Sequence, residues 1–186
     1  MRAALALLML AAPCWAEPWI DYDLLFQQNA DKVVVRTDAL GETTRQIDFD
    51  NGVSVSCSDQ GCVGLDQNGA IGCVWSIYSS LLAVAEVCGI PKERTANIAE
   101  YHRLLTTFVA RNAVPPRSLA EIEALHQSEV DHYRRGGDGP LDCAAALAPD
   151  SDVGMMLDGL MSQEVDLDAA TKALATPRLP VMNPCL

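Results

Sequence analysis

The chain has 186 residues, with 25 aspartate and glutamate residues against 13 lysine and arginine residues, and its formal net charge at pH 7 is −12. A surface this acidic repels nucleic-acid phosphates and anionic lipid, and it suits a basic protein partner. We therefore predict no nucleic-acid binding. A chain of this length is expected to form one domain around one hydrophobic core.

The first sixteen residues have the pattern of a secretory signal peptide. Arg2 supplies a positive start, an apolar run follows at residues 3–12, and Cys14 and Ala16 are the small residues before a cleavage site. We predict cleavage after Ala16, which leaves residues 17–186 and, because Arg2 is lost, changes the net charge from −12 to −13. The short Ala/Leu-rich leader is typical of bacteria, so we expect a periplasmic or extracellular protein. We expect no membrane insertion, since no later run is long and apolar enough to span a bilayer.

The N-terminal part of the mature chain, residues 17–67, predicts a short helix followed by a small antiparallel meander. Asn51-Gly52 is a strong hairpin signal because both residues tolerate positive φ. The helix is expected at residues 21–30, and the strands at residues 32–37, 43–49, 52–57 and 62–66.

The next part, residues 73–175, predicts helices. Residues 73–88 are apolar nearly all round, which favours a central buried helix that Gly89 ends. Ser118 and Glu121 form a capping box that begins a later helix, and Gly136-Gly137 end it. The expected helices lie at residues 73–88, 92–112, 118–135, 142–147, 152–162 and 168–175, and the proline-rich tail at 176–186 is expected to be extended.

These elements predict an α+β fold, with a small N-terminal antiparallel β-meander followed by a disulfide-stapled helical bundle. A single domain over residues 17–186 contains all of them. Three methionines, Met155, Met156 and Met161, lie at helical spacing with leucines, so we expect them in the core, with a methionine-rich partner groove as the alternative.

Six cysteines remain after the leader, and an even number in an exported chain predicts disulfides. Cys57 and Cys62 flank a predicted hairpin turn, where facing Cα atoms stand within disulfide range. Cys73 and Cys88 lie at opposite ends of one predicted helix, about 22 Å apart, and cannot pair with each other. Each must therefore pair with Cys143 or Cys185, or stay free. If the three long helices run up, down and up, Cys143 comes near Cys88, and Cys185 is left for Cys73.

The stretch around Cys73 also resembles the nucleophile region of the papain-like cysteine peptidases. Gln67 precedes Cys73 by six residues and Trp75 follows closely. The resemblance implies a Cys73 nucleophile and an oxyanion-hole Gln67. The chain departs from the family pattern because Val74 separates the cysteine from the tryptophan. Its three histidines also fall in predicted helices, where the family's catalytic histidine lies on a strand.

The helix at 118–135 carries a second candidate site. Glu-x-x-His spacing occurs twice, at Glu123/His126 and Glu129/His132. Carboxylate and imidazole groups at this spacing can reach one metal ion. We therefore keep His126, Glu129 and His132 as an alternative metal site, beside the interpretation that His126 is a hydrogen-bonded histidine at the core boundary.

The chain carries no P-loop, dinucleotide-binding, esterase, zinc-protease or haem-attachment motif. We therefore predict no enzymatic activity and no cofactor. The preferred interpretation is an exported, disulfide-stabilised interaction module, of the accessory or inhibitor kind, for a basic envelope or secreted protein. A hydrolase using Cys73 and a metal-binding protein using the 118–135 helix are the alternatives. No pattern indicates the oligomeric state.

Overall fold

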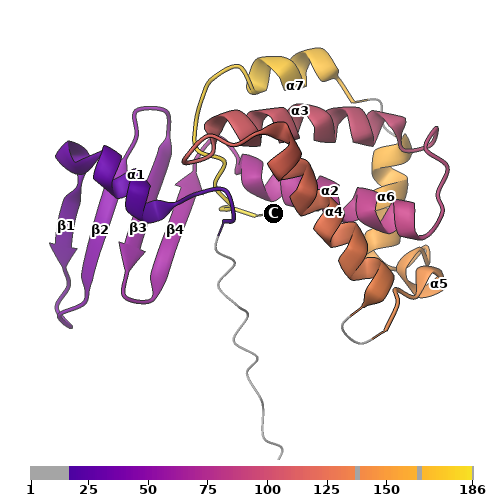
Figure 1. Ribbon diagram of the computed structural model, residues 1–186, viewed down its shortest axis with the longest axis horizontal. Coiled ribbons are helices and arrows are strands. Elements are labelled where there is room, and N and C mark those ends of the chain that lie inside the picture. Colours follow the sequence, from indigo (N-terminus) through magenta and orange to yellow (C-terminus); the bar gives the residue numbers. More distant parts are fainter. Residues whose placement is uncertain (1–16, 137–138, 163–164, 186) are drawn as a thin grey trace, which may run out of the picture.

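The computed structural model describes residues 17–136, 139–162 and 165–185. A four-stranded antiparallel sheet forms one end and a group of helices forms the other (Figure 1). This arrangement confirms the predicted α+β fold. The N-terminal elements are α1 (Tyr22–Gln28), a 3₁₀ turn (Ala30–Lys32), β1 (Val34–Thr37), β2 (Thr43–Asp48), β3 (Val53–Ser58) and β4 (Gly61–Asp66). The helical elements are α2 (Ile71–Val87), α3 (Ala96–Asn112), α4 (Leu119–Arg135), α5 (Cys143–Ala146), α6 (Asp152–Ser162) and α7 (Leu167–Ala173).

The sheet is a meander in which each strand pairs with the next, in the order β1-β2-β3-β4. Alternate residues of β3 are buried and half-exposed, as expected for a strand with one covered face. Val53 and Val55 face the core together with Ile47 of β2, and all three are almost completely buried. The opposite face is open and carries the exposed Val63.

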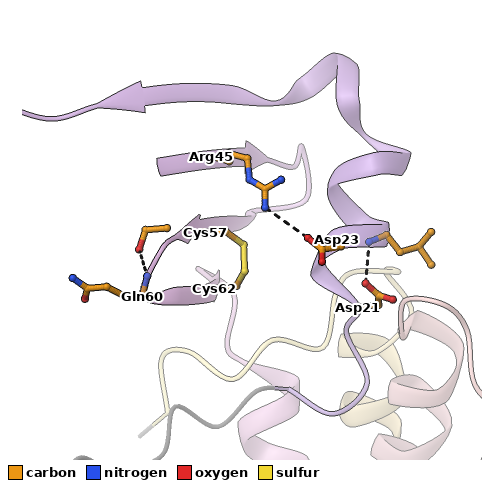
Figure 2. Close-up of a disulfide and its surroundings, with 8 residues drawn as sticks. Asp21, Asp23, Arg45, Cys57, Gln60 and Cys62 are labelled. Carbon is orange, nitrogen blue, oxygen red and sulfur yellow. Dashed lines mark hydrogen bonds and ion pairs between the residues drawn. A yellow bond between two sulfur atoms is a disulfide. The ribbon is translucent and has the colours of Figure 1, made fainter. Parts of the chain in front are cut away.

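Helix α1 is attached to the core face of the sheet (Figure 2). Its N-cap is Asp21, whose carboxylate accepts a backbone N–H of the first turn at 2.9 Å. Asp23 forms an ion pair of 3.7 Å with Arg45 on β2, and Cys57 of β3 is joined to Cys62 of β4. The disulfide closes the last hairpin, whereas α1 is held on the sheet mainly by its two buried apolar side chains, which belong to the same core cluster as those of β2 and β3.

The three long helices surround a shared interior. Helix α2 lies against both α3 and α4, and its Trp75 indole donates to the Thr106 hydroxyl at 3.0 Å. Helix α4 begins with the predicted capping box, in which Ser118 and Glu121 bond each other's backbone N–H groups. Gly89 follows the C-cap of α2 and has a φ of +70°, so it ends the helix as predicted.

Two expectations about the helices are wrong. The second long helix begins at Ala96 and not at residue 92, because Lys92 and Arg94 belong to i→i+3 turns after Pro91. The sequence places Met155 and Met156 in the core, but their exposed fractions are 53% and 45%. Helix α6 buries Leu157 instead, and the two methionines lie on its outer side.

The C-terminal tail crosses the junction between sheet and helices. The Trp19 indole donates to the Pro180 carbonyl at 2.6 Å, and Gly72 N–H donates to the Val181 carbonyl at 3.0 Å. A Cβ atom on Gly72 would overlap the Pro180 carbonyl oxygen, so glycine permits this close approach. Farther along, Asn183 pairs with Leu65 of β4 in a parallel bridge. The tail therefore ties the two ends of the protein together.

Candidate functional site

The three disulfides join Cys57 to Cys62, Cys73 to Cys185 and Cys88 to Cys143. The first pair is the one expected across the hairpin turn, and the other two are the pairs that follow from an up-down-up order of the three long helices. The Cα atoms of the Cys73–Cys185 and Cys88–Cys143 pairs are each 5.4 Å apart. Cys73 and Cys88 lie at opposite ends of α2, so they do not pair with each other.

Cys73 lies at the start of α2 and is almost completely buried. With its sulfur bonded to Cys185 it has no thiolate, which is the nucleophilic form of cysteine. Gln67 is exposed in the turn after β4, where its backbone N–H bonds the Gly52 carbonyl. This geometry does not support the peptidase alternative.

A polar cluster lies between α2 and α4. Ser79 Oγ and His126 Nδ1 share a hydrogen bond of 2.9 Å, and the Ser80 hydroxyl donates to the Glu129 carboxylate. Ser79 is fully buried, so no substrate reaches its hydroxyl while the helices stay packed. The contacts hold α4 on α2, and they confirm that His126 is a hydrogen-bonded histidine at the core boundary.

His102 of α3 completes this cluster from the third side. Its ring centroid lies 5.4 Å from that of Trp75 and 5.0 Å from that of His126. Its Nε2 atom is buried and has no hydrogen-bond partner in the part of the chain that the structure describes. Burial, followed by the charge of His126, lowers the pKa of His102 to about 4. His102 is therefore neutral at physiological pH.

The residues of the alternative metal site do not converge. His126 and Glu129 point to hydroxyl groups of α2, whereas His132 is exposed beside the Tyr133 ring. Among the described residues, no group of three or more histidine, cysteine or acidic side chains is placed to hold a metal ion.

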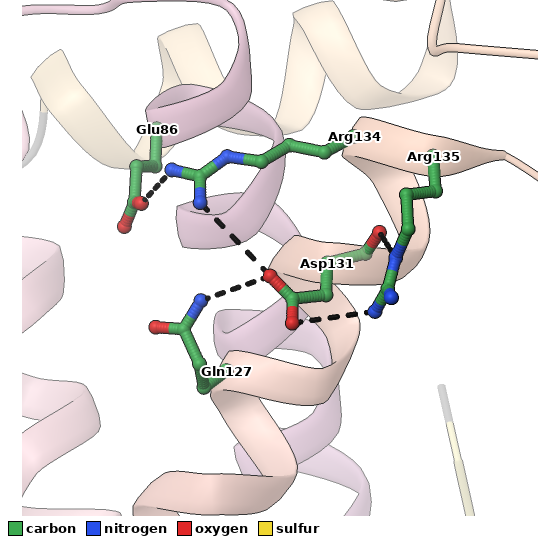
Figure 3. Close-up of polar contacts among 5 residues, drawn as sticks. All are labelled: Glu86, Gln127, Asp131, Arg134 and Arg135. Atoms are coloured by element: carbon green, nitrogen blue, oxygen red, sulfur yellow. Dashed lines mark hydrogen bonds and ion pairs between the residues drawn. The ribbon is translucent and has the colours of Figure 1, made fainter.

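The far end of α4 carries a surface ion network (Figure 3). Arg134 reaches across to Glu86 of α2 at 2.5 Å, and Asp131 bonds Gln127 and Arg135 within α4. These residues are exposed or half-exposed, and they pair with one another, so the network attaches α4 to α2 without leaving a free charge in this group.

Sequence reasoning missed the buried ion pair between Asp66 and Arg178. Arg178 Nε lies 2.6 Å from Asp66 Oδ2, and their side chains are 7% and 0% exposed, respectively. The guanidinium group also donates to the Ala173 carbonyl and lies over the Phe108 ring. The two residues are 112 positions apart, and no local pattern links them.

The most unusual exposed feature is one side of α6, which we call the α6 surface: Asp152, Met155, Met156 and Asp158. Positions three and four apart are neighbours on a helix surface. Asp152 therefore lies beside both methionines, and Asp158 lies beside Met155. Both methionines are about half exposed. Asp158 also lines an open depression between α6 and the beginning of α3, together with Arg94 on the α3 side.

The surroundings of the α6 surface are strongly acidic. Between Arg135 and Lys172 the sequence has eight acidic residues and no lysine or arginine. Six of these acids are described, all are exposed, and none takes part in an ion pair of the described residues. Two of the six cap helices, namely Asp142 on α5 and Asp166 on α7. Asp152 and Asp168 lie in the first turns of α6 and α7. The helix dipole favours negative charge at these four positions, but no lysine or arginine pairs with them among the described residues.

Comparison of the chain with known protein families, with curated proteins and with solved structures found no match. No helix of the described residues is long and apolar enough to cross a membrane.

Proposed function

We propose that the protein is an exported, non-enzymatic interaction module that binds a basic protein through the α6 surface. The observation that carries the proposal is the exposure of Met155 and Met156 among unpaired acidic residues. Methionine side chains are flexible and polarisable, and they suit surfaces that bind apolar side chains of a partner. The surrounding carboxylates favour lysine and arginine residues on the same partner.

Export is supported by the signal pattern of residues 1–16 and by the three disulfides, which persist in oxidising compartments. The disulfides join the tail to α2 and the α5 segment to the end of α2. A surface presented on a stapled frame loses little conformational freedom when it binds.

The first test uses a photo-cross-linking amino acid at position 156 in the full chain, produced in the cells of origin. The same amino acid at position 63, on the open face of the sheet, is the control, because both native side chains are about half exposed. We expect a specific adduct with a basic protein from position 156 only. An adduct from position 63 alone, or none from either position, would reject the α6 surface as the binding site.

The second test measures the affinity of the purified pair. We expect the double variant Met155→Ser/Met156→Ser to raise Kd at least tenfold, because methionine is enriched at interfaces and a few buried side chains carry most of the binding energy. Asp152→Asn/Asp158→Asn is expected to weaken binding and reduce its dependence on salt. Val63→Ser is the matched control and should leave Kd unchanged. An unchanged Kd in both α6 variants would contradict the proposal.

A further inference from the structure

Residues 17–20 are built into the core beneath the C-terminal tail. Trp19, Ile20 and Glu17 have exposed fractions of 1%, 7% and 6%, respectively. The first residues of a domain are usually poorly ordered unless specific contacts hold them. Trp19 has such a contact with the tail, but the burial of an acidic residue at position 17 needs its own explanation.

The carboxyl group of Glu17 is only half satisfied. One oxygen, Oε1, accepts the backbone N–H of Met182 at 2.7 Å. The other oxygen, Oε2, is buried and has no hydrogen-bond partner among the described residues. Burial disfavours the charged form of a carboxyl group when one of its oxygens has no partner. Burial therefore raises the pKa of Glu17 to about 7, although the Met182 hydrogen bond opposes this shift.

The charged groups on the neighbouring elements do not supply the missing partner. Arg117 donates to the carbonyl of the residue after Glu17 and pairs with Glu121. Its Nε is buried without a partner among the described residues, and it makes no hydrogen bond to Glu17. Asp66 and Arg178 pair with each other beside the tail. The tail residues over Glu17, 180–182, carry no ionisable side chain. No charged side chain of the described residues hydrogen-bonds or pairs with the Glu17 carboxyl group.

We infer that the missing partner is the α-ammonium group of Glu17 itself, created when the leader is removed. Hydrolysis of the Ala16–Glu17 peptide bond adds water, leaves a carboxylate on Ala16 and frees the nitrogen of Glu17 as an ammonium group. This inference rests on the export part of the proposed function. It adds that cleavage after Ala16 completes the N-terminal end of the fold.

The covalent geometry of the residue limits the distance between the two groups. The α-nitrogen and the carboxylate oxygens of one glutamate stand at most about 6 Å apart. Before cleavage, the nitrogen is a neutral amide and offers no positive charge. After cleavage, an opposite charge at this range lowers the pKa of a carboxyl group by about 1–3 units. Glu17 is then ionised at neutral pH, and its carboxylate has a charged partner.

The test compares two full-length forms of the oxidised protein, one that begins at Glu17 and one that retains Trp15 and Ala16. NMR titration of the Glu17 side-chain carboxyl carbon gives its pKa in each form. We expect the pKa to be at least one unit lower in the form that begins at Glu17. For a fall of the folded pKa from about 7 to 6, linkage makes the equilibrium constant for unfolding of this form at pH 7.5 about eightfold smaller than that of the extended form.

The variant Glu17→Gln, made in both forms, removes the carboxylate and should abolish the difference in unfolding. Equal pKa values in the two native-sequence forms would overturn the inference, and so would a stability difference that persists in Glu17→Gln. The intact mass of the exported protein tests the cleavage position separately, and an N-terminus other than Glu17 would also overturn it. Failure to bind a basic partner would reject the interaction module and leave the titration result standing.

Discussion

The buried Asp66–Arg178 pair offers the sharpest test of what holds the tail in place. The variant Asp66→Asn keeps the size of the side chain and an oxygen that can accept the Asn68 N–H, as Asp66 Oδ1 does at 2.8 Å. It removes the negative charge 2.6 Å from Arg178 Nε. The guanidinium group is then a buried cation without a counterion.

Removing one partner of a buried ion pair typically costs about 3–5 kcal/mol of stability. Arg178 keeps its bond of 3.2 Å to the Ala173 carbonyl and its position over the Phe108 ring. These contacts compensate part of the loss, so we expect a decrease near the lower limit, about 3 kcal/mol. With a urea m value of about 2 kcal/mol/M, the unfolding midpoint should fall by about 1.5 M.

The assay is equilibrium urea unfolding of the oxidised mature protein, followed by tryptophan fluorescence. The exposed pair Glu100–Arg103 has the same separation of 2.6 Å, so Glu100→Gln is a matched control, and it should leave the midpoint unchanged. The double variant Asp66→Asn/Arg178→Met removes both charges and should recover at least about 1 kcal/mol. A loss below about 1 kcal/mol in Asp66→Asn, or an equal loss in the control, would refute the reasoning.

Three further predictions concern the disulfides, the polar cluster and the tail contact. All six cysteines of the mature protein should resist alkylation in denaturant without reductant. The variant Cys73→Ser/Cys185→Ser should lower the free energy of unfolding by about 4–5 kcal/mol, because the Cys73–Cys185 disulfide closes a loop of more than 100 residues. The pKa of His102 is about 4 in the folded protein and about 6.5 in the unfolded chain, so the unfolded chain takes up the proton at higher pH. The free energy of unfolding should therefore fall by up to about 3 kcal/mol as the pH drops from about 6.5 to 4. Gly72→Ala should destabilise by about 1–3 kcal/mol through overlap with the tail, whereas Gly159→Ala, with open space around it in α6, should stabilise by about 0.5–1 kcal/mol.

Each of these has a result that would contradict it. A thiol at Cys73 that reacts rapidly without denaturant would return the nucleophile interpretation. His102→Phe removes the titrating group, so an unchanged acid slope in that variant would show that other groups cause it. Equal unfolding midpoints for the two alanine variants would mean that the tail does not approach α2 as closely as described.

Much of the local structure was predictable because its causes lie within a few residues. The capping box of Ser118 and Glu121 begins α4 as expected. Asn51-Gly52 turns the chain between β2 and β3, and Gly52 adopts the positive φ of 86° that its lack of a Cβ atom permits. The pairing of Cys57 with Cys62 follows from a five-residue separation across a hairpin.

The candidate sites depended on contacts that no local pattern contains. Sequence spacing placed His126 at the core boundary, but only the packing of α4 on α2 selected Ser79 as its partner. The same spacing put Met155 and Met156 in the core, because α6 is apolar on more than one side and the sequence does not say which side meets α3. The neighbouring helix decided that Leu157 is buried and that the methionines are exposed.

The course of the tail shows the same division most clearly. The sequence by itself predicted that the tail forms no helix, because Pro177, Pro180 and Pro184 interrupt any helix there, and residues 176–185 contain none. Only the tertiary structure placed Arg178 against Asp66 and Met182 against Glu17. A buried charge is tolerated only where a partner stands beside it, and partners more than 100 residues apart meet only when the whole chain has packed.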